Sequence, residues 1–529
     1  MPAWPKSIIM FGASALTARM AMRLRRSDSE GRAQSRAYRS LIRRLGTTTY
    51  WRAAGIRPAM SYEEFRRGVA PRTYDSLSSA IARTEAGEAD VLWPGCTRLF
   101  AASSGTSNGE SRRLPVSVEM LKHFRAGCRD SLLYYTARRG QAGVLRGRHL
   151  FLTGSTALHA IGDGPPHRAF AGEWPAIAAL NLPRWAESDL YEPGAAIGAL
   201  TDWPAKLDAI ITRTSDRDIS LIAGMPPWVL NFTETLRTKR TAAGRPIESL
   251  AALWPNLECL VHGGMAVGPY QNELRAALGP NVNFHEIFAA AEGIFAAQDG
   301  PANAGLRIMA NLGIFFEFLP FSEYDEHRLE SLGDKAVTLR DVKPGVDYVL
   351  LLTTPAGLAR YVIGDIVRFT STRPPRLHYI GRTSLQLAAF GERVLEKDVT
   401  DALLAVCGRH RWTIVNFHVA PLLGTDLTGQ TRGRHEWWVE LKPGTVETPT
   451  GPQMAVELDL ELQRLHREYA VRRGSGRIEA PTVRLVMPGV FRHWMRYHKR
   501  IGGQYKIARC RGDRVVADEL AQITKFARD

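Results

Sequence analysis

The sequence predicts an α/β protein with a large N-terminal domain and a small, mobile α+β C-terminal domain. Strand-like apolar runs alternate with helical segments between residues 150 and 284, which is typical of a mostly parallel sheet with helices on both faces. From Ile314 several strand-like runs follow one another, which indicates an antiparallel or barrel-like piece. After Gly391 a shorter mixture of helices and strands follows. We expect domains 1–385 and 386–529, with a hinge near Thr383–Gly391.

Local signals place individual elements. Ser61 and Glu64 form a capping-box pattern for a short helix that stops at Gly68. Ser117 is expected to cap a helix through Tyr135. Residues 160–205, rich in Pro, Gly and Trp, are expected to be irregular. Further expected helices are 229–237, 271–278, 395–406 and one long helix over 454–472. Expected strands are 150–153, 219–223, 257–262, 282–284, 315–319, 348–353, 366–370, 377–380, 413–420, 436–441 and 482–487.

Composition limits the class of protein. The chain has 529 residues, 45% hydrophobic and 23% charged, with a net charge of +16. The basic residues are mostly scattered and not interleaved with aromatics, so we expect a polyanionic small molecule such as a nucleotide and no nucleic acid. Five cysteines without a C-x-x-C pair indicate neither a zinc site nor a disulfide framework, and fit a reducing cytoplasm.

The first 26 residues carry no clear cleavage-site order of a secretory signal, and no apolar run in the chain approaches the ~18 residues of a membrane span. We expect an amphipathic first helix and no transmembrane segment. Contact of this helix with a membrane surface is the alternative.

The stretch Leu99–Pro115 is the first candidate site. Its centre contains Ser103, Ser104, Gly105, Thr106 and Ser107, followed by Asn108 and Gly109. Glycines allow the backbone to approach a ligand, and N–H groups with hydroxyls can hold phosphate. No Lys follows Gly109, so the stretch is not the P-loop fingerprint. A solvated linker is the alternative interpretation.

Three further segments carry candidate chemistry. Glu292 follows the small-residue run 288–291, and a Mg²⁺ ion with nucleotide phosphates would satisfy its carboxylate; a plain helix-start Glu is the alternative. Asp365 follows Gly364 and could hold a ribose, or lie in a tight turn. Lys506, after Gly502-Gly503, could neutralise a developing negative charge, or be an ordinary surface Lys.

Arg382 is a weaker candidate, because it lies just before the expected hinge, where it could reach a nucleotide or simply be solvated. No H-E-x-x-H or G-x-S-x-G pattern is present, which leaves metalloprotease and α/β-hydrolase chemistry unsupported.

In their order and spacing these segments resemble the Gretchen Hagen 3 family of acyl-acid amido synthetases, within the adenylate-forming superfamily, and we expect a bacterial member. The matching segments are 103–109 (SSGTSNG), 288–292 (FAAAE, against Y-x-x-S-E), 357–365 (GLARYVIGD), Gly381-Arg382, and 504–510 (QYKIARC, against Q-Y-K-x-P-R-C). The resemblance runs from about Thr47 to Cys510, which is nearly the whole chain.

The chain departs from the family pattern at several positions. Arg112 and Arg113 lie where a Lys is usual, Phe288 replaces Tyr and Ala291 replaces Ser. Val362 replaces a frequent Arg, and Ala508 replaces the Pro that follows the catalytic Lys. Adenine stacking could persist on Phe288, whereas the contact of a Tyr hydroxyl could not.

The resemblance implies a ligase that uses ATP and Mg²⁺ to convert a carboxylic acid into an acyl adenylate and then an amide of an amino acid. Ser103–Ser107 would hold phosphates, Glu292 Mg²⁺, Asp365 the ribose, and Lys506 the α-phosphate during attack. The acyl pocket would lie between the 115–135 helix, 224–228 and 263–268. An acyl-CoA ligase and a degenerate nucleotide-binding member are the alternatives.

Overall fold

The computed structural model describes residues 6–26, 29–103, 112–161, 167–425, 431–442, 449–498 and 507–526. The chain packs into two compact units. Unit 1 comprises Met1–Ile363 and Val367–Tyr379, and unit 2 comprises Gly364–Ile366 and Ile380–Asp529. The units describe packing alone, and the division into functional domains at 385/386 stays a prediction.

Unit 1 contains helices, short 3₁₀ helices and strands. The helices are α1 (Lys6–Leu24), α2 (Ser29–Leu45), α3 (Thr49–Ala53), α4 (Tyr62–Gly68), α5 (Tyr74–Glu85), α6 (Val118–Arg139), α7 (Trp174–Leu180), α8 (Arg184–Asp189), α9 (Ala195–Gly198), α10 (Trp203–Thr214), α11 (Pro226–Ala242), α12 (Leu250–Leu253) and α13 (Gln271–Leu278). The 3₁₀ helices are η1 (Gly143–Leu145), η2 (Gly268–Tyr270), η3 (Ala302–Ala304), η4 (Phe321–Glu323) and η5 (Glu326–Lys335).

The strands up to the end of the large sheet are β1 (Leu99–Ala102), β2 (Arg113–Pro115), β3 (Arg148–Leu152), β4 (His159–Ile161), β5 (Ala169–Glu173), β6 (Tyr191–Glu192), β7 (Ile219–Gly224), β8 (Cys259–Gly263), β9 (Asn283–Ala290), β10 (Gly293–Ala297), β11 (Leu306–Ile308), β12 (Phe315–Pro320), β13 (Val337–Thr338), β14 (Asp347–Thr353), β15 (Tyr361–Thr372) and β16 (Pro375–Arg382). Unit 2 adds β17 (Gln386–Leu387), β18 (Val394–Leu395), α14 (Glu396–His410), β19 (Ile414–Thr425), β20 (Thr431–Leu441), α15 (Gly451–Leu465), α16 (Arg467–Gly474), β21 (Thr482–Val486), α17 (Val490–Tyr497) and α18 (Val515–Phe526).

One twelve-stranded sheet carries both the parallel and the antiparallel strands, in the order β13-β12-β14-β15-β16-β11-β10-β9-β8-β7-β3-β6. Strands β6, β3, β7, β8 and β9 pair in parallel, and the hairpin β9–β10 starts the antiparallel part. The α/β fold class is confirmed. The parallel strands expected between residues 150 and 284 and the antiparallel strands expected from Ile314 belong to one sheet. The chain reverses at the β9–β10 hairpin, and the strands on either side of it stay hydrogen-bonded.

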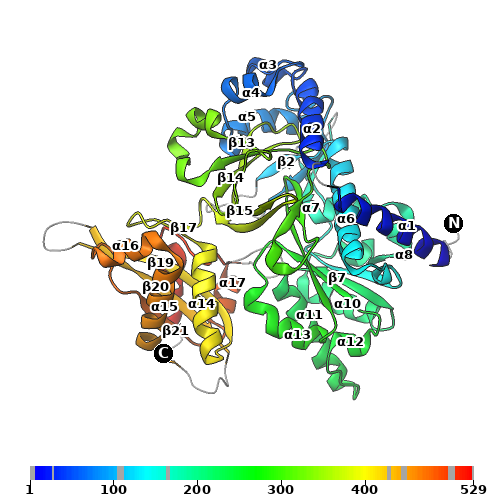
Figure 1. Ribbon diagram of the computed structural model, residues 1–529. Helices are drawn as coiled ribbons and strands as arrows, with labels where there is room; N and C mark the ends of the chain where they lie inside the picture. The colour runs from blue at the N-terminus through cyan, green and yellow to red at the C-terminus, as the bar shows by residue number, and fades with distance from the viewer. Residues whose placement is uncertain are drawn as a thin grey trace. The chain divides into compact units, whose positions relative to one another are not determined.

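Helices cover both faces of the parallel strands, as predicted (Figure 1). Ile222 and Leu260 pack in the cluster that contains side chains of α10, α11 and α13. The preceding residues, Leu221 and Cys259, pack in another cluster with Tyr135 of α6. Successive strand residues point to opposite faces, so this alternation shows that both faces are buried.

Several local predictions are confirmed. Ser61 and Glu64 make a reciprocal capping box at α4, which ends at Gly68. Ser117 caps α6, accepting a hydrogen bond from Met120 N–H, and α6 continues to Arg139. The expected helix over 271–278 coincides with α13.

Two local predictions are wrong. Residues 160–205 contain β5, β6 and helices α7, α8 and α9, because prolines begin several of these helices instead of breaking them. Proline suits the first helical turn, where its missing N–H has no partner to lose. The expected helix over 454–472 is two helices, α15 and α16, interrupted at His466, whose side chain caps α16.

Unit 2 is a three-stranded sheet, β19-β20-β21, packed against helices, which confirms its α+β class. Figure 1 shows α14, α15 and α16 beside this sheet. Within the described ranges no helix is both long and apolar enough to cross a membrane.

Candidate active site

The segment SSGTSNG begins directly after a strand, as predicted. β1 has a buried centre, Phe100 and Ala101, and pairs with β2 in an antiparallel hairpin. Ser103 N–H donates to the carbonyl of Arg112 at 2.8 Å, which closes the neck of the connection. Ser104, Gly105, Thr106 and Ser107 lie outside the described residues. The hairpin therefore fixes where this connection leaves and re-enters the fold.

The two arginines at the neck have different surroundings. The Arg113 guanidinium pairs with Glu85, with Nε 2.8 Å from Oε1. The Arg112 guanidinium lies 5.2 Å from the ring centre of Tyr74, and no ion pair is found for it among the described residues. Burial raises the pKa of Glu85, so Arg113 compensates a half-buried carboxyl. Among the described residues, Arg112 is thus the guanidinium of the neck that has no acidic partner.

Glu292 lies in the two-residue turn between β9 and β10, where Ala290 pairs with Gly293. Glu292 is buried, with 7% of its surface exposed. The alternative of a helix-start Glu is therefore wrong, because the chain reverses here into a second strand. A two-residue hairpin turn holds its side chains in fixed directions relative to the strands on either side.

His123 of α6 holds this hairpin from the side. Ile294 N–H donates to its Nε2 at 2.9 Å, and its Nδ1 lies 2.9 Å from the carbonyl oxygen of Leu312. The two partners require the proton on Nδ1, because a carbonyl can only accept. Burial lowers the pKa of His123 to about 4, so the ring is neutral near pH 7. No sequence signal marked this residue, because its importance depends on contacts between α6 and β10.

Phe288 lies on β9, close to the Glu292 turn. Its ring packs edge-on against Phe295 at 5.1 Å and at a tilt against Tyr379 at 5.7 Å. Only 8% of Phe288 is exposed. The ring is thus part of an aromatic cluster, and its stacking on adenine stays a prediction.

Asp365 and Arg382, 17 positions apart, meet in unit 2. Arg382 Nε donates to Asp365 Oδ1 at 2.9 Å. Asp365 lies inside β15 and not in the tight turn that we considered, and its side chain is 4% exposed, whereas that of Arg382 is 41% exposed. Thr383 N–H donates to the carbonyl of Gly364, which ties the two segments together beside the pair. The carboxylate of the pair is buried, and its guanidinium is partly exposed to solvent.

Lys506 lies outside the described residues, but the segment that follows it is firmly placed in unit 2. Cys510 forms a parallel β-bridge with Val419 of β19. Val419 N–H donates to the carbonyl of Arg509, and Arg511 N–H donates to the carbonyl of Val419. Ile507 is buried with Trp438 and Trp494. The chain next to Lys506 is therefore anchored to β19.

Arg360, in the segment GLARYVIGD, is completely buried, and its importance was missed. Its guanidinium pairs with Glu317, with Nη2 3.0 Å from Oε1. It also donates to the carbonyls of Arg66, Val69 and Gly333 at 2.6–2.8 Å. Arg360 lies in a segment that matches the family, but that match does not distinguish a buried arginine from a solvated one, because its partners come from distant segments.

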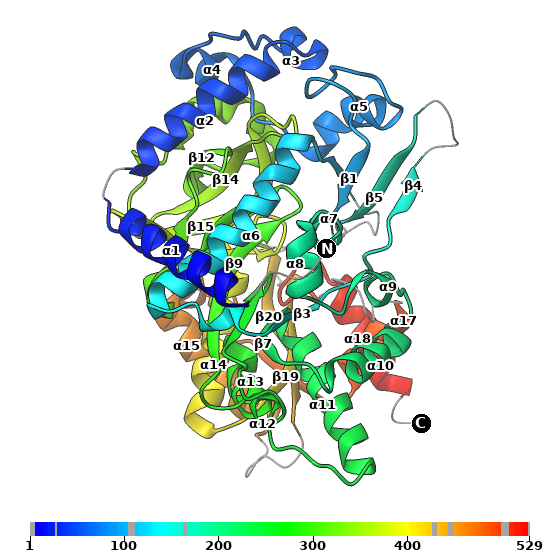
Figure 2. The same ribbon diagram turned by 90° about the vertical axis from the view of Figure 1, so that its right-hand side faces the viewer.

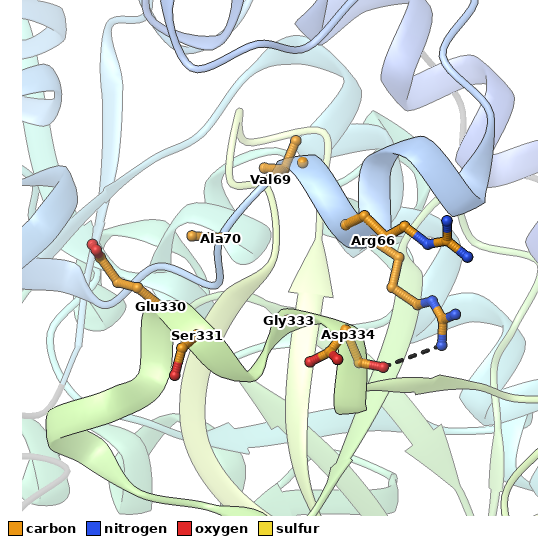
Figure 3. Close-up of a pocket in the computed structure, with 9 residues that line it drawn as sticks. Arg66, Val69, Ala70, Glu330, Ser331, Gly333 and Asp334 are labelled. Carbon is orange, nitrogen blue, oxygen red and sulfur yellow. Dashed lines mark hydrogen bonds between the residues drawn. The ribbon is translucent and has the colours of Figure 1, made fainter.

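A pocket of about 390 Å³ lies next to this anchor, between α4 and η5 (Figure 3). It is lined by Arg66, Arg67, Gly68, Val69, Ala70, Glu330, Ser331, Gly333 and Asp334. The Arg66 guanidinium donates to the carbonyl of Asp334 at one side. None of the predicted site residues lines this pocket.

The stretches expected to border an acyl pocket share an edge of the large sheet. Gly224 ends β7 and Gly263 ends β8, and these strands are parallel neighbours. Ligands of parallel α/β sheets bind at the carboxyl ends of the strands. The pocket itself stays a prediction.

Two solved structures have folds similar to the fold of this chain. A 2-hydroxyisobutyryl-CoA ligase in its postadenylation state matches with a TM-score of 0.55 and 15% identity, covering 94% of this chain and 91% of the other. A GH3.15 acyl acid amido synthetase matches with a TM-score of 0.73 and 18% identity, covering 99% and 97%.

The chain belongs to the GH3 family. The GH3 family N-terminal domain matches residues 26–158, the central domain residues 307–382 and the C-terminal domain residues 397–515. The indole-3-acetic acid-amido synthetase GH3.8 of Oryza sativa subsp. indica is 25% identical over 90% of this chain and 87% of its own length. The indole-3-acetic acid-amido synthetase GH3.3 of Arabidopsis thaliana is 24% identical over 90% of this chain and 89% of its own length.

Proposed function

We propose that this protein is an ATP-dependent ligase that activates a carboxylic acid as an acyl adenylate and transfers the acyl group to the amine of an amino acid. The observation that carries the proposal is the pair Asp365–Arg382, joined at 2.9 Å with the arginine half-exposed. A carboxylate at this position could accept the ribose hydroxyls, and the guanidinium, which is 41% exposed, could contact a phosphate. Membership of the GH3 family supports this reading.

In the first step a carboxylate oxygen of the acid attacks the α-phosphorus of ATP, and pyrophosphate leaves. A carboxylate carbon is a poor electrophile, and the new acyl–phosphate bond supplies a good leaving group. Ser103 and the hydroxyls at 104, 106 and 107, with Gly105, would hold the phosphates of pyrophosphate. Lys506 would stabilise the charge that develops on the α-phosphate.

Glu292 would hold Mg²⁺ beside the phosphates. A single buried carboxylate fits this ion, which usually binds one or two carboxylates and takes its other ligands from phosphate and water. Among the described residues no group of three or more His, Cys, Asp or Glu side chains is arranged to hold a metal. The ion, when bound, would neutralise phosphate charge, and the hairpin held by His123 would keep the Glu292 carboxylate in place.

In the second step the amino group attacks the acyl carbon, AMP leaves with the C–O electron pair, and the nitrogen loses a proton. We expect unit 2 to rotate about Thr383–Gly391 between the steps and so move Lys506 away from the reacting centre.

All five cysteines are unpaired, which supports a reducing compartment such as the cytoplasm.

A screen of aromatic and aliphatic carboxylates for ATP–pyrophosphate exchange tests the first step. We expect exchange with at least one acid, and a loss of about 10²–10³-fold in Lys506→Ala, as for removal of one preorganised charge-stabilising group. Lys335→Ala, an exposed lysine of η5, is the matched control and should keep the wild-type rate. Exchange near the wild-type rate in Lys506→Ala would show that the role of Lys506 is wrong.

The acceptor is then identified with the active acid. Amino acids or CoA are added and AMP release is measured, with the product read by mass spectrometry. An amide product supports the proposal. A thioester product supports the alternative of an acyl-CoA ligase, and absence of AMP with every acid supports a degenerate nucleotide-binding member.

A further inference from the structure

The first helix carries apolar side chains on a face that the fold leaves uncovered. Ala13, Thr17 and Met20 of α1 are buried, and Thr17 Oγ1 donates to Thr136 Oγ1 of α6 at 2.9 Å. The opposite side of the helix presents Phe11, 80% exposed, and Met22, 59% exposed. Positions 11, 15, 18 and 22 follow helical spacing, so these two side chains lie on one outward line.

Basic side chains are also exposed near the C-terminal end of α1. Arg19, Arg25 and Arg26 are exposed at and beyond the C-terminal half of the helix. The match to the GH3 N-terminal domain begins at residue 26, after the end of α1.

The second helix carries a stripe of arginines. Arg32, Arg36, Arg39 and Arg43 are all exposed and lie at i, i+4, i+7 and i+11, which places them on one side of α2. No ion pair is found for these four guanidinium groups within the part of the chain that the structure describes. In the sequence they look scattered, and the helix brings them together.

The two helices lie on the same side of unit 1 (Figure 2). Figure 2 shows α1 in front of α6, while α2 lies beside it over β12 and β14. Gln34 of α2 fixes that helix to the sheet by donating to the carbonyls of Ala310 and Ile314 at 2.8 Å. We call the exposed side chains of Phe11, Met22, Arg32, Arg36, Arg39 and Arg43 the N-terminal basic face.

We propose that the N-terminal basic face binds the surface of a membrane that contains anionic phospholipids. Guanidinium groups pair with lipid phosphates, and exposed Phe and Met side chains enter the headgroup region. A nucleic acid would take up the arginines but would gain nothing from Phe11 and Met22. The proposal is independent of the ligase reaction, because none of these residues lies in the candidate active site.

The interaction is expected to be reversible and sensitive to salt. An Arg near an anionic leaflet changes the partition constant by about fivefold, and the effect is screened beyond about 10 Å at 0.1 M salt. Two apolar side chains alone cannot hold the protein on a neutral bilayer. Binding should therefore require both anionic lipid and the arginines.

Co-sedimentation of the full-length protein with vesicles tests the proposal. Vesicles of phosphatidylcholine with 30% phosphatidylglycerol are compared with pure phosphatidylcholine, at low and high salt. We expect binding only to the anionic vesicles at low salt. Arg32→Ser with Arg36→Ser, Arg39→Ser and Arg43→Ser should lower the partition constant more than tenfold.

Matched variants separate this face from net charge and from general hydrophobicity. Arg168, Arg184, Arg217 and Arg245 are exposed elsewhere on unit 1, and their combined change to Ser removes the same charge. Phe11→Ser with Met22→Ser is compared with Val456→Ser and Leu460→Ser on α15, which are also exposed. Both control variants should bind vesicles like the wild type, and all variants should keep their unfolding temperature.

Two results would overturn the proposal. One is equal loss of binding in the stripe variant and in its charge-matched control, which would mean that net charge alone attracts the protein. The other is absence of vesicle binding at low salt while a double-stranded oligonucleotide binds and the stripe variant loses it, which would assign the face to nucleic acid.

Discussion

Two arginine–carboxylate pairs each contain one residue of the segment GLARYVIGD, and they differ in solvent access. In unit 1 Arg360 and Glu317 have side chains 0% and 1% exposed, and Arg360 also bonds three backbone carbonyls. In unit 2 Asp365 is 4% exposed but Arg382 is 41% exposed. The same kind of pair is therefore fully buried in unit 1, whereas in unit 2 one of its two partners reaches the solvent.

The largest expected effect is on stability, from Arg360→Met. Removing one partner of a buried pair leaves Glu317 uncompensated, which typically costs about 3–5 kcal/mol. Chemical denaturation should show this loss in unit 1. Arg368→Met is the control, since Arg368 pairs with Asp347 while 43% exposed and should cost about 0–1 kcal/mol. Equal losses of unfolding free energy in the two variants would show that buried and half-exposed pairs do not differ in their contribution to stability.

Asp365→Asn should affect activity and leave stability nearly unchanged. The variant loses a charge-assisted acceptor worth about 2 kcal/mol, or about thirtyfold in kcat/KM for ATP. The half-exposed Arg382 can be solvated, so the unfolding temperature should move little. Asp347→Asn, which breaks the other half-exposed pair, is the control and should keep its ATP kinetics. Unchanged ATP kinetics in Asp365→Asn would exclude ribose binding there.

Acid should destabilise unit 1 before unit 2. In unit 1, burial lowers the pKa of His123, His149 and His262 to about 4 and that of His285 to about 3. In unit 2, burial lowers the pKa of His418 to about 4. The unfolded chain binds more protons than the fold between pH 6.5 and 4. Stability is therefore full above pH 6.5 and is lost as the pH falls, by about 1.4 kcal/mol per pH unit for each histidine.

Hydrogen exchange at pH 7 and pH 5, corrected for intrinsic rates, measures this difference. Amides of α6 and of β9–β10 should lose protection before those of β19–β20. His123→Gln should reduce the pH dependence of unit 1 and also weaken the hold on the Glu292 turn. Equal loss of protection in both units would contradict the prediction.

The smallest effect is expected at the neck of the β1–β2 hairpin. Arg112→Ala should raise KM for ATP severalfold, about 1 kcal/mol, with an unchanged unfolding temperature. Arg113→Ala should instead lower stability by about 1 kcal/mol, since Glu85 is half-buried and loses its partner. The reverse pattern would assign the phosphate contact to Arg113.

Much of the fold could be predicted because its signals are local. The capping box of Ser61 and Glu64 and the cap of Ser117 depend on residues within three positions of each other. The interpretation failed where one residue type has two uses, as with the prolines at the starts of α7 and α8. The long-helix prediction failed at His466, because nothing in its neighbours specified an interruption.

The candidate site was predictable in its residue types and in their order along the chain. The structure brings Asp365 and Arg382 together and places Glu292 in a buried turn. It adds His123, which no motif contained, and the burial of Arg360, which the motif containing it did not reveal. Each of these two acts through backbone groups of segments more than 25 positions away, and backbone carbonyls and amides carry no sequence mark.

By itself the sequence determined the α/β class, the family resemblance and the set of polar residues offered to a nucleotide, because periodicity and motif spacing are properties of the chain. Only the tertiary structure decided which charged side chains are buried and which reach the solvent. In the structure Arg360 is buried and Arg382 is partly exposed, and Arg113 has a carboxylate partner whereas Arg112 lies against the ring of Tyr74. The structure also places the exposed arginines of α2 on one side of that helix. Solvent access depends on segments distant in sequence, and it decides whether a charged side chain supports the fold or is available to a ligand.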